Sequence, residues 1–154
     1  MLTAAQNPWG ATWEANNTVL YGQGPGGIFR VSADGGKGER ILTVKPGESA
    51  HGPQMLPDGH TVLFTLAPQA VGGWNGARIV AQDLNTGKQT VVIDGGTDAR
   101  YLATRHIVYA LNGALLAAPF DASALKLTGG AVPLVEGVAQ TNAGQTGAAQ
   151  FSVT

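Results

Sequence analysis

The chain repeats one arrangement of apolar and polar positions three times. In each repeat a short turn leads into a strand-length apolar run, at Thr18 to Tyr21, at Thr61 to Phe64 and at His106 to Tyr109. Two further apolar runs of similar length follow each of these. Short runs of β-branched and aromatic residues between turn residues predict β-strands. A repeat of about 40–50 residues with about four such strands is typical of a β-propeller blade.

The repeats predict one all-β domain over residues 1–154, built from three four-stranded blades. The blades are expected at about residues 9–44, 49–94 and 99–138. A polar, glycine-rich linker follows, and residues 148–153 then match the innermost strand of a further blade. The sequence therefore predicts three blades and one extra strand.

Turn chemistry supports this division of the chain. Asp58 and Gly59 stand between two apolar runs, which is the strongest hairpin signal in the sequence, and Gly59 is expected at positive φ. The irregular stretch 67–76 is expected to be a surface loop anchored by Trp74. Trp13, in an apolar run, is expected in the core.

Three blades cannot close a ring, because closed propellers have about 4–8 of them. An open arc leaves apolar faces and a strand edge uncovered. We expect a homodimer in which two arcs form a six-bladed ring, with residues 148–153 pairing near the partner's first blade. Other oligomers and a fragment of a longer protein remain alternatives.

Composition narrows the class of protein. Only 12% of residues are charged, where about 25% is usual, and 23 are glycine, which suits a β-protein with many tight turns. A net charge of −1 with no basic block argues against binding to nucleic acid or to anionic lipid. The absence of cysteine excludes disulfides and thiol chemistry. With no signal peptide and no long apolar run, we expect a soluble chain of unknown compartment.

Several stretches carry a resemblance to a known family: residues 26–36, 48–60, 77–96, 98–102, 116–121 and 147–153. Here the chain resembles the TolB-type, WD-like β-propeller repeats of bacteria, in particular those found behind serine/threonine kinase domains and transmembrane sensors. The resemblance covers nearly the whole chain. It implies a propeller that serves as a platform for binding ligands or proteins, and nothing in the chain resembles the kinase itself.

The candidate site follows from propeller geometry. Loops that lead from the outermost strand of one blade to the innermost strand of the next meet at one mouth of the central channel, where ligands bind. These loops are residues 46–51, 95–100 and 139–147. The side chains expected to face one another there are Glu48, His51, Asp98, Arg100, Gln140, Asn142 and Gln145.

Two kinds of chemistry are open to this set. His51 is a candidate general base, with Glu48 as the second catalytic candidate. Glu48, Asp98 and Asn142 offer the oxygen ligands that calcium prefers. The structural alternatives are a histidine bonded to backbone and carboxylates that are solvated or paired with Arg100.

The remaining candidates would bind a ligand directly: Asp98, Arg100, Gln140 and Gln145. Our first hypothesis is therefore a module that binds a small molecule or a peptide at the channel mouth, with no cofactor or with calcium. The alternative is a calcium-dependent hydrolase, such as a lactonase, acting at the propeller axis. No serine-nucleophile or zinc-protease motif is present. His60 and His106, at the heads of strands, are expected to be structural.

Overall fold

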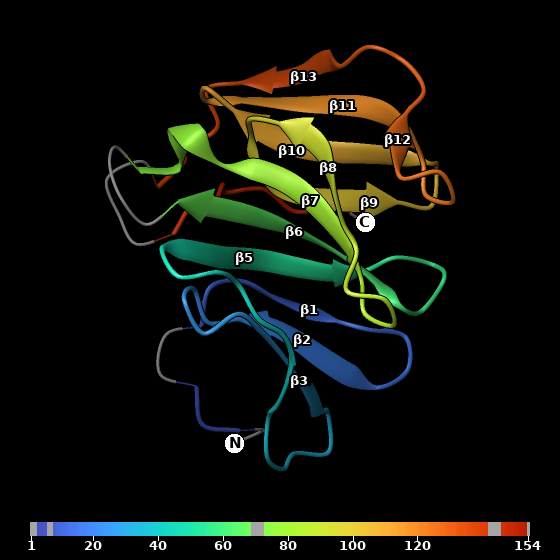
Figure 1. Cartoon of the computed structure of the whole chain (residues 1–154). Coiled ribbons are helices and arrows are strands. Elements are labelled where there is room, and N and C mark those ends of the chain that lie inside the picture. The colour runs from blue at the N-terminus through green and yellow to red at the C-terminus, as the bar shows by residue number, and fades with distance from the viewer. Residues whose placement is uncertain (1–2, 6–7, 69–72, 142–145, 154) are drawn as a thin grey trace.

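The computed structural model describes residues 3–5, 8–68, 73–141 and 146–153, and these form an all-β protein of three antiparallel sheets. The sheets follow one another along the molecule in chain order (Figure 1). Within the described residues the one helical element is the 3₁₀ turn η1 (Gly73–Gly76). None of the described helices is long and apolar enough to cross a membrane.

The three sheets correspond to the three predicted blades. The first contains β1 (Ala11–Trp13), β2 (Thr18–Gly22), β3 (Ile28–Ser32) and β4 (Glu39–Leu42). The second contains β5 (Glu48–Met55), β6 (Thr61–Pro68), β7 (Arg78–Asp83) and β8 (Gln89–Asp94). The third contains β9 (Thr97–Leu102), β10 (His106–Leu111), β11 (Ala114–Asp121), β12 (Lys126–Leu127) and β13 (Val132–Glu136). The strands pair in chain order, except that both β12 and β13 pair with β11.

The middle sheet is buried on both faces, and this explains its continuous apolar sequence. Successive side chains of a strand point to opposite faces. In β6, Val62 and Phe64 accordingly pack into the core shared with the first sheet. Leu63, between them, packs into the core shared with the third sheet, beside Ile107 and Phe120. The two cores hold the three sheets together as layers.

The outer faces of the end sheets are partly covered by the chain's own terminal segments. On the first sheet Tyr21 stacks on Phe29 with ring centroids 5.6 Å apart, and the N–H of Gly38 donates to Oγ1 of Thr3 at 3.2 Å. On the third sheet Phe151 and Val153 pack over the buried side chains of Val108, Leu115 and Ala117.

The predicted extra strand is shorter than expected. Residues 148–153 make a single bridge, between Ala149 and Gln140, flanked by two backbone hydrogen bonds to residues 139–141. The segment thus bonds to residues 139–141 of its own chain, and its pairing near a partner's first blade stays a prediction.

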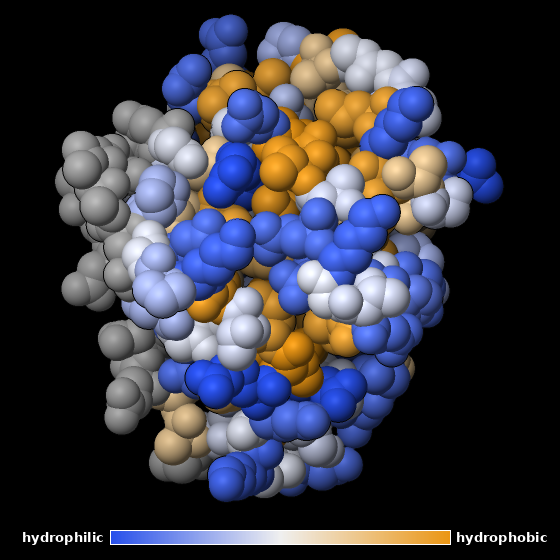
Figure 2. Space-filling model, viewed as in Figure 1, coloured by the Kyte–Doolittle hydropathy of each residue, from blue (hydrophilic) through white to orange (hydrophobic). Residues whose placement is uncertain are grey.

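One apolar expectation differs from the structure. Trp13, the last residue of the three-residue strand β1, is 64% exposed, whereas Thr12 beside it bonds to the carbonyl of Pro53 on the second sheet, so the assignment of Trp13 to the core was wrong. Val132 and Val135 of β13 are 56% and 52% exposed. Figure 2 shows apolar side chains gathered over the third sheet, in the upper part of the view, among polar ones.

Candidate functional site

The structure places four of the predicted site residues in strands, where we had expected loops: Glu48, His51, Asp98 and Arg100. The connections turn earlier than expected, at Gly47 (φ 82°) and Gly96 (φ 79°), so the strands begin sooner. We call the end of the molecule where β5 and β9 begin the channel end. Strand geometry there decides which side chains can meet.

Asp98 and Arg100 lie two residues apart on β9 and form an ion pair, with Oδ1 of Asp98 2.8 Å from Nη2 of Arg100. The two atoms are not aligned for a hydrogen bond. The other oxygen of Asp98, Oδ2, accepts the N–H of Ala149 at 3.1 Å. Nη1 of Arg100 donates to the carbonyl of Ala99 at 2.9 Å and to that of Gly52 at 3.4 Å. Most of the charge of this pair is therefore balanced within the chain.

His51 is buried beside this pair, at 1% exposure. Its ring contacts the edge of Trp74, with centroids 5.5 Å apart, and its Nδ1 has no hydrogen-bond partner among the described residues. Burial lowers the pKa of His51, the nearby Asp98 carboxylate raises it, and the Arg100 guanidinium lowers it again; the net shift is downward. The ring is held neutral and away from solvent.

Glu48 does not join His51, although both were predicted to be catalytic. The two residues are three apart on a regular stretch of β5, so their side chains point to opposite faces. Oε2 of Glu48 accepts the N–H of Lys45 at 3.2 Å, and Oε1 lies 3.7 Å from Nη2 of Arg78. The predicted acid–base pair is not assembled.

Of the predicted amides, Gln140 reaches the channel end, where its Nε2 donates to Oγ1 of Thr97 at 2.6 Å. Asn142 and Gln145 lie outside the described residues.

The described residues do not fit a calcium ion. Among them no group of three carboxylate or imidazole side chains is placed to hold a metal ion, and Asp98, the buried carboxylate at the channel end, has a guanidinium against it. A cation there would be repelled by Arg100.

Trp74 anchors its loop, as predicted. Its ring is buried, meets Trp9 edge to face with centroids 5.8 Å apart, and lies against the backbone of Gly147. A β-carbon on Gly147 would come within 2.6 Å of the ring. The C-terminal segment therefore rests on this tryptophan.

A pocket of about 690 Å³ lies at the opposite end of the sheets, and sequence reasoning missed it. We call it the interblade pocket. It opens between the second and third sheets, past the ends of β5 and β9, and its lining includes Leu56, Tyr101, Arg105, Phe120 and Asp121. The signal that could have found it is the repeat itself, because equivalent hairpin turns of successive blades also converge at this end.

The floor of the interblade pocket is apolar and its rim is polar. Leu56 and Phe120 are buried, and Tyr101 meets Phe120 edge to face with centroids 6.0 Å apart. At the rim, Arg105 is in the left-handed conformation (φ 61°), and its carbonyl accepts the N–H of Phe120 at 2.8 Å. His106 bonds through Nδ1 to a backbone carbonyl 2.9 Å away, so Nδ1 carries the hydrogen.

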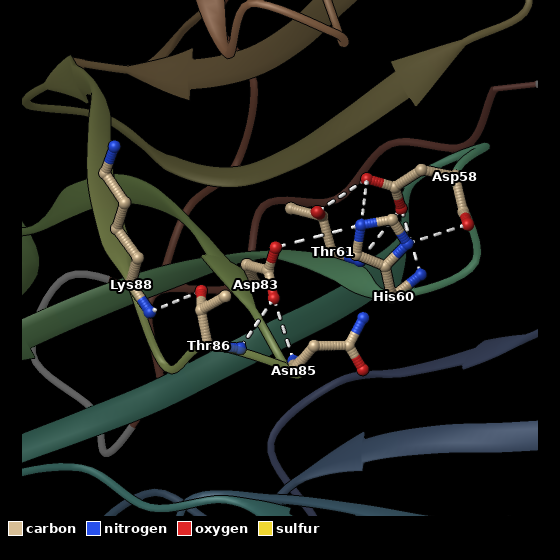
Figure 3. A network of polar contacts seen from close by, with 7 residues as sticks. All are labelled: Asp58, His60, Thr61, Asp83, Asn85, Thr86 and Lys88. Atoms are coloured by element: carbon tan, nitrogen blue, oxygen red, sulfur yellow. Dashed lines mark hydrogen bonds and ion pairs between the residues drawn. The ribbon is translucent and has the colours of Figure 1, made fainter.

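A polar network on the second sheet borders this pocket (Figure 3). Asp58 accepts the backbone N–H groups of His60 and Thr61 at Oδ1 and the Thr61 hydroxyl at Oδ2. Burial raises the pKa of Asp58, but these hydrogen bonds outweigh it and hold the pKa below its ordinary value. Nε2 of His60 lies 3.6 Å from Asp58 and 3.7 Å from Asp83, so it spans two hairpin turns. This is the structural role expected for His60.

Comparisons with known proteins identify the fold. No family model and no curated protein sequence matches the chain. Its structure is similar to that of a calcium-binding protein, regucalcin, from Agrobacterium tumefaciens, with a TM-score of 0.55 and 14% sequence identity. The match covers 86% of this chain and 60% of the regucalcin chain. The chain therefore has a propeller-like fold and spans about three fifths of that protein.

Proposed function

We propose that the chain is a binding module whose ligand, a small molecule or a short peptide segment, occupies the interblade pocket. The observation that carries this proposal is the pocket itself, at about 690 Å³. Ligand sites typically have about 300–1,000 Å³, an apolar lining and a few polar groups that fix orientation. Leu56, Tyr101 and Phe120 supply the apolar floor, and Arg105 and Asp121 the polar rim.

The channel end, where the sequence predicted the binding site, has fewer polar groups free to bind a ligand. Asp98 and Arg100 pair with each other and with backbone groups, and His51 is enclosed. Binding there would have to break contacts that hold the chain together.

The alternative of a calcium-dependent hydrolase such as a lactonase finds no assembled site. Regucalcin is described as a calcium-binding protein. In this chain, however, Glu48 and His51 point apart, and a guanidinium faces Asp98. The described residues therefore do not support that function.

The chain's lack of cysteine allows a direct test of the binding function. A single cysteine introduced by Thr128→Cys would line the interblade pocket, and Thr43→Cys would place one on an exposed site of the first sheet as a control. Both proteins would be exposed to a library of disulfide-bearing fragments. Strong conjugation of a few fragments at position 128, with a uniform low level at position 43, would support a ligand site. Uniform conjugation at both positions would contradict it.

We also propose that two chains assemble into a six-bladed ring. Val132 and Val135 support this, since they extend the outer apolar face of the third sheet beyond the part that the C-terminal segment covers. In each chain the same kind of apolar contact already joins neighbouring sheets. Light scattering at micromolar concentration should give twice the mass of 15.7 kDa, and Val132→Asp with Val135→Asp should halve it. A wild-type monomer would contradict the ring.

A further inference from the structure

The rim of the interblade pocket carries two opposite charges, Arg105 and Asp121, which interact at a distance but form no ion pair within 4.0 Å. The carbonyl of Arg105 bonds to the N–H of Phe120, so Arg105 lies beside the end of β11, where Asp121 stands. Among the described residues no carboxylate oxygen lies within 4.0 Å of the Arg105 guanidinium. The guanidinium is exposed and open to a ligand.

Asp121 has one oxygen engaged and one open. Its Oδ1 accepts the N–H of Ser123 at 2.9 Å, the Ser123 hydroxyl at 2.6 Å and the N–H of Ala124 at 3.1 Å. These bonds close the turn after β11 and fix the carboxylate in place. Its Oδ2 receives no hydrogen bond from the described part of the chain. Asp58, the other carboxylate in the lining, has both oxygens engaged.

The pocket therefore offers a ligand a cation and a carboxylate oxygen on one rim, with an apolar floor beneath. A purely anionic ligand would meet Asp121 and a purely cationic one would meet Arg105, each with a like-charge cost. A neutral ligand would leave both charges without a partner. A ligand that carries both charges close together satisfies both groups through charge-assisted hydrogen bonds.

Building on the proposed function, we propose that the ligand is a free amino acid with a large apolar side chain. Its α-ammonium group donates to Oδ2 of Asp121, and its α-carboxylate accepts from the guanidinium of Arg105. Its side chain lies on the floor formed by Leu56, Tyr101 and Phe120. In an α-amino acid one carbon carries both charged groups, so a single small ligand can present both to the same rim.

The test is calorimetric titration of the full chain with L-phenylalanine and four relatives that each lack one feature. N-acetyl-L-phenylalanine lacks the ammonium charge, L-phenylalanine amide lacks the carboxylate, 2-phenylethanol lacks both, and glycine lacks the apolar side chain. We expect saturable binding of L-phenylalanine and affinity at least about tenfold weaker for each relative.

Two variants test which residue binds the carboxylate of the ligand and which binds its ammonium group. Arg105→Gln should weaken L-phenylalanine binding about tenfold or more and leave the amide unaffected. Asp121→Asn keeps an acceptor oxygen for the turn, and it should weaken L-phenylalanine without affecting the N-acetyl form. Lys37→Gln, which removes an exposed charge from the first sheet, should change neither and serves as the control.

The outcomes separate this inference from the binding function. Equal affinity for L-phenylalanine and 2-phenylethanol, unchanged in both variants, would overturn the amino-acid assignment while the pocket still binds a ligand. Equal affinity for L-phenylalanine and its N-acetyl form would also overturn it, in favour of a simple carboxylate. If no compound of this series binds, the assignment fails, and if the fragment library also finds no site at position 128, the binding function fails with it.

Discussion

The backbone N–H of Ala149 donates a hydrogen bond to Oδ2 of Asp98 at 3.1 Å, across 51 positions of sequence. The same carboxylate is ion-paired with Arg100 through its other oxygen. One buried side chain thus balances a charge on β9 and ties the C-terminal segment to the first strand of the third sheet. This bond holds the segment against β9 of its own chain.

Replacing that carboxylate should loosen the segment and destabilise the fold. Asp98→Ala removes one partner of a largely buried ion pair, and because Arg100 retains some access to water we expect a loss of about 2–4 kcal/mol in the free energy of unfolding. Urea denaturation measures this directly. Glu136→Ala, on exposed β13, should stay within about 0.5 kcal/mol of the wild type. A similarly small change in Asp98→Ala would mean that the contacts of Asp98 with Ala149 and Arg100 contribute little to stability.

Gly147 tests the contact between the C-terminal segment and Trp74. The β-carbon of Gly147→Ala would lie 2.6 Å from the indole ring, so the segment or the ring must move, at a cost of about 1–3 kcal/mol. Tryptophan fluorescence should shift, and cleavage after residue 146 by a protease should become faster. Gly76→Ala is the control, because its β-carbon would meet only Pro68, at an ordinary 3.6 Å. Equal behaviour of the two variants would contradict the contact.

The fold was predictable because, in each repeat, the local sequence pattern favours the same strands and turns that the folded blade contains. Apolar runs of strand length and turns such as Asp58-Gly59 define every blade without reference to distant residues. The extent of β5 was not predictable, because Glu48 to His51 are mixed in polarity and pair with β6 only through backbone bonds. The exposure of Trp13 was not predictable either, because local sequence does not reveal whether a neighbouring sheet covers a side chain.

Gly59 has the positive φ that its turn predicted, at 75°. A β-carbon there would have no heavy atom within 4 Å, so Gly59→Val should destabilise through backbone strain alone, by about 1–3 kcal/mol. Gly130→Val introduces the same side chain where φ is outside the left-handed region and space is also open, and should be close to neutral. The difference in thermal midpoint between the two variants isolates the strain. No difference would show that the turn relaxes freely.

His51 should make stability depend on pH between about pH 5.5 and 7. An unfolded histidine takes up a proton near pH 6.5, whereas the lowered pKa of His51 delays its protonation in the folded state. The unfolded chain therefore binds more protons in this window, and stability is complete above it and falls as the pH is lowered. The loss at pH 5.5 is at most about 1.4 kcal/mol.

The slope of unfolding free energy against pH, compared between variants, tests whether His51 causes the pH dependence. His51→Gln should flatten the plot of unfolding free energy against pH over this window, whatever its effect on absolute stability. His106→Gln, at the start of β10, should keep the slope. A wild-type slope retained in His51→Gln would assign the effect elsewhere.

The candidate site was predictable in part. In the structure Asp98 pairs with Arg100 and Gln140 bonds to Thr97, near the start of β9, while the binding role expected for these residues stays a prediction. The sequence could not show that Asp98 and Arg100 would pair with each other. That pairing depends on the face of β9 that each side chain takes, and the charge of Asp98 is also balanced by the backbone N–H of Ala149. The interblade pocket depends on how two sheets diverge, and Tyr101 and Phe120 carry no sequence signal of that separation.

Amide chemical-shift mapping of the wild-type chain with a set of small apolar, charged and zwitterionic fragments tests the proposed binding site most directly. We expect the fragments that bind to shift a contiguous set of signals around the interblade pocket, including those of Tyr101, Thr104, Arg105 and Ala122. Shifts confined to the channel end, around His51 and Gln140, would contradict it, as would the absence of any saturable shift.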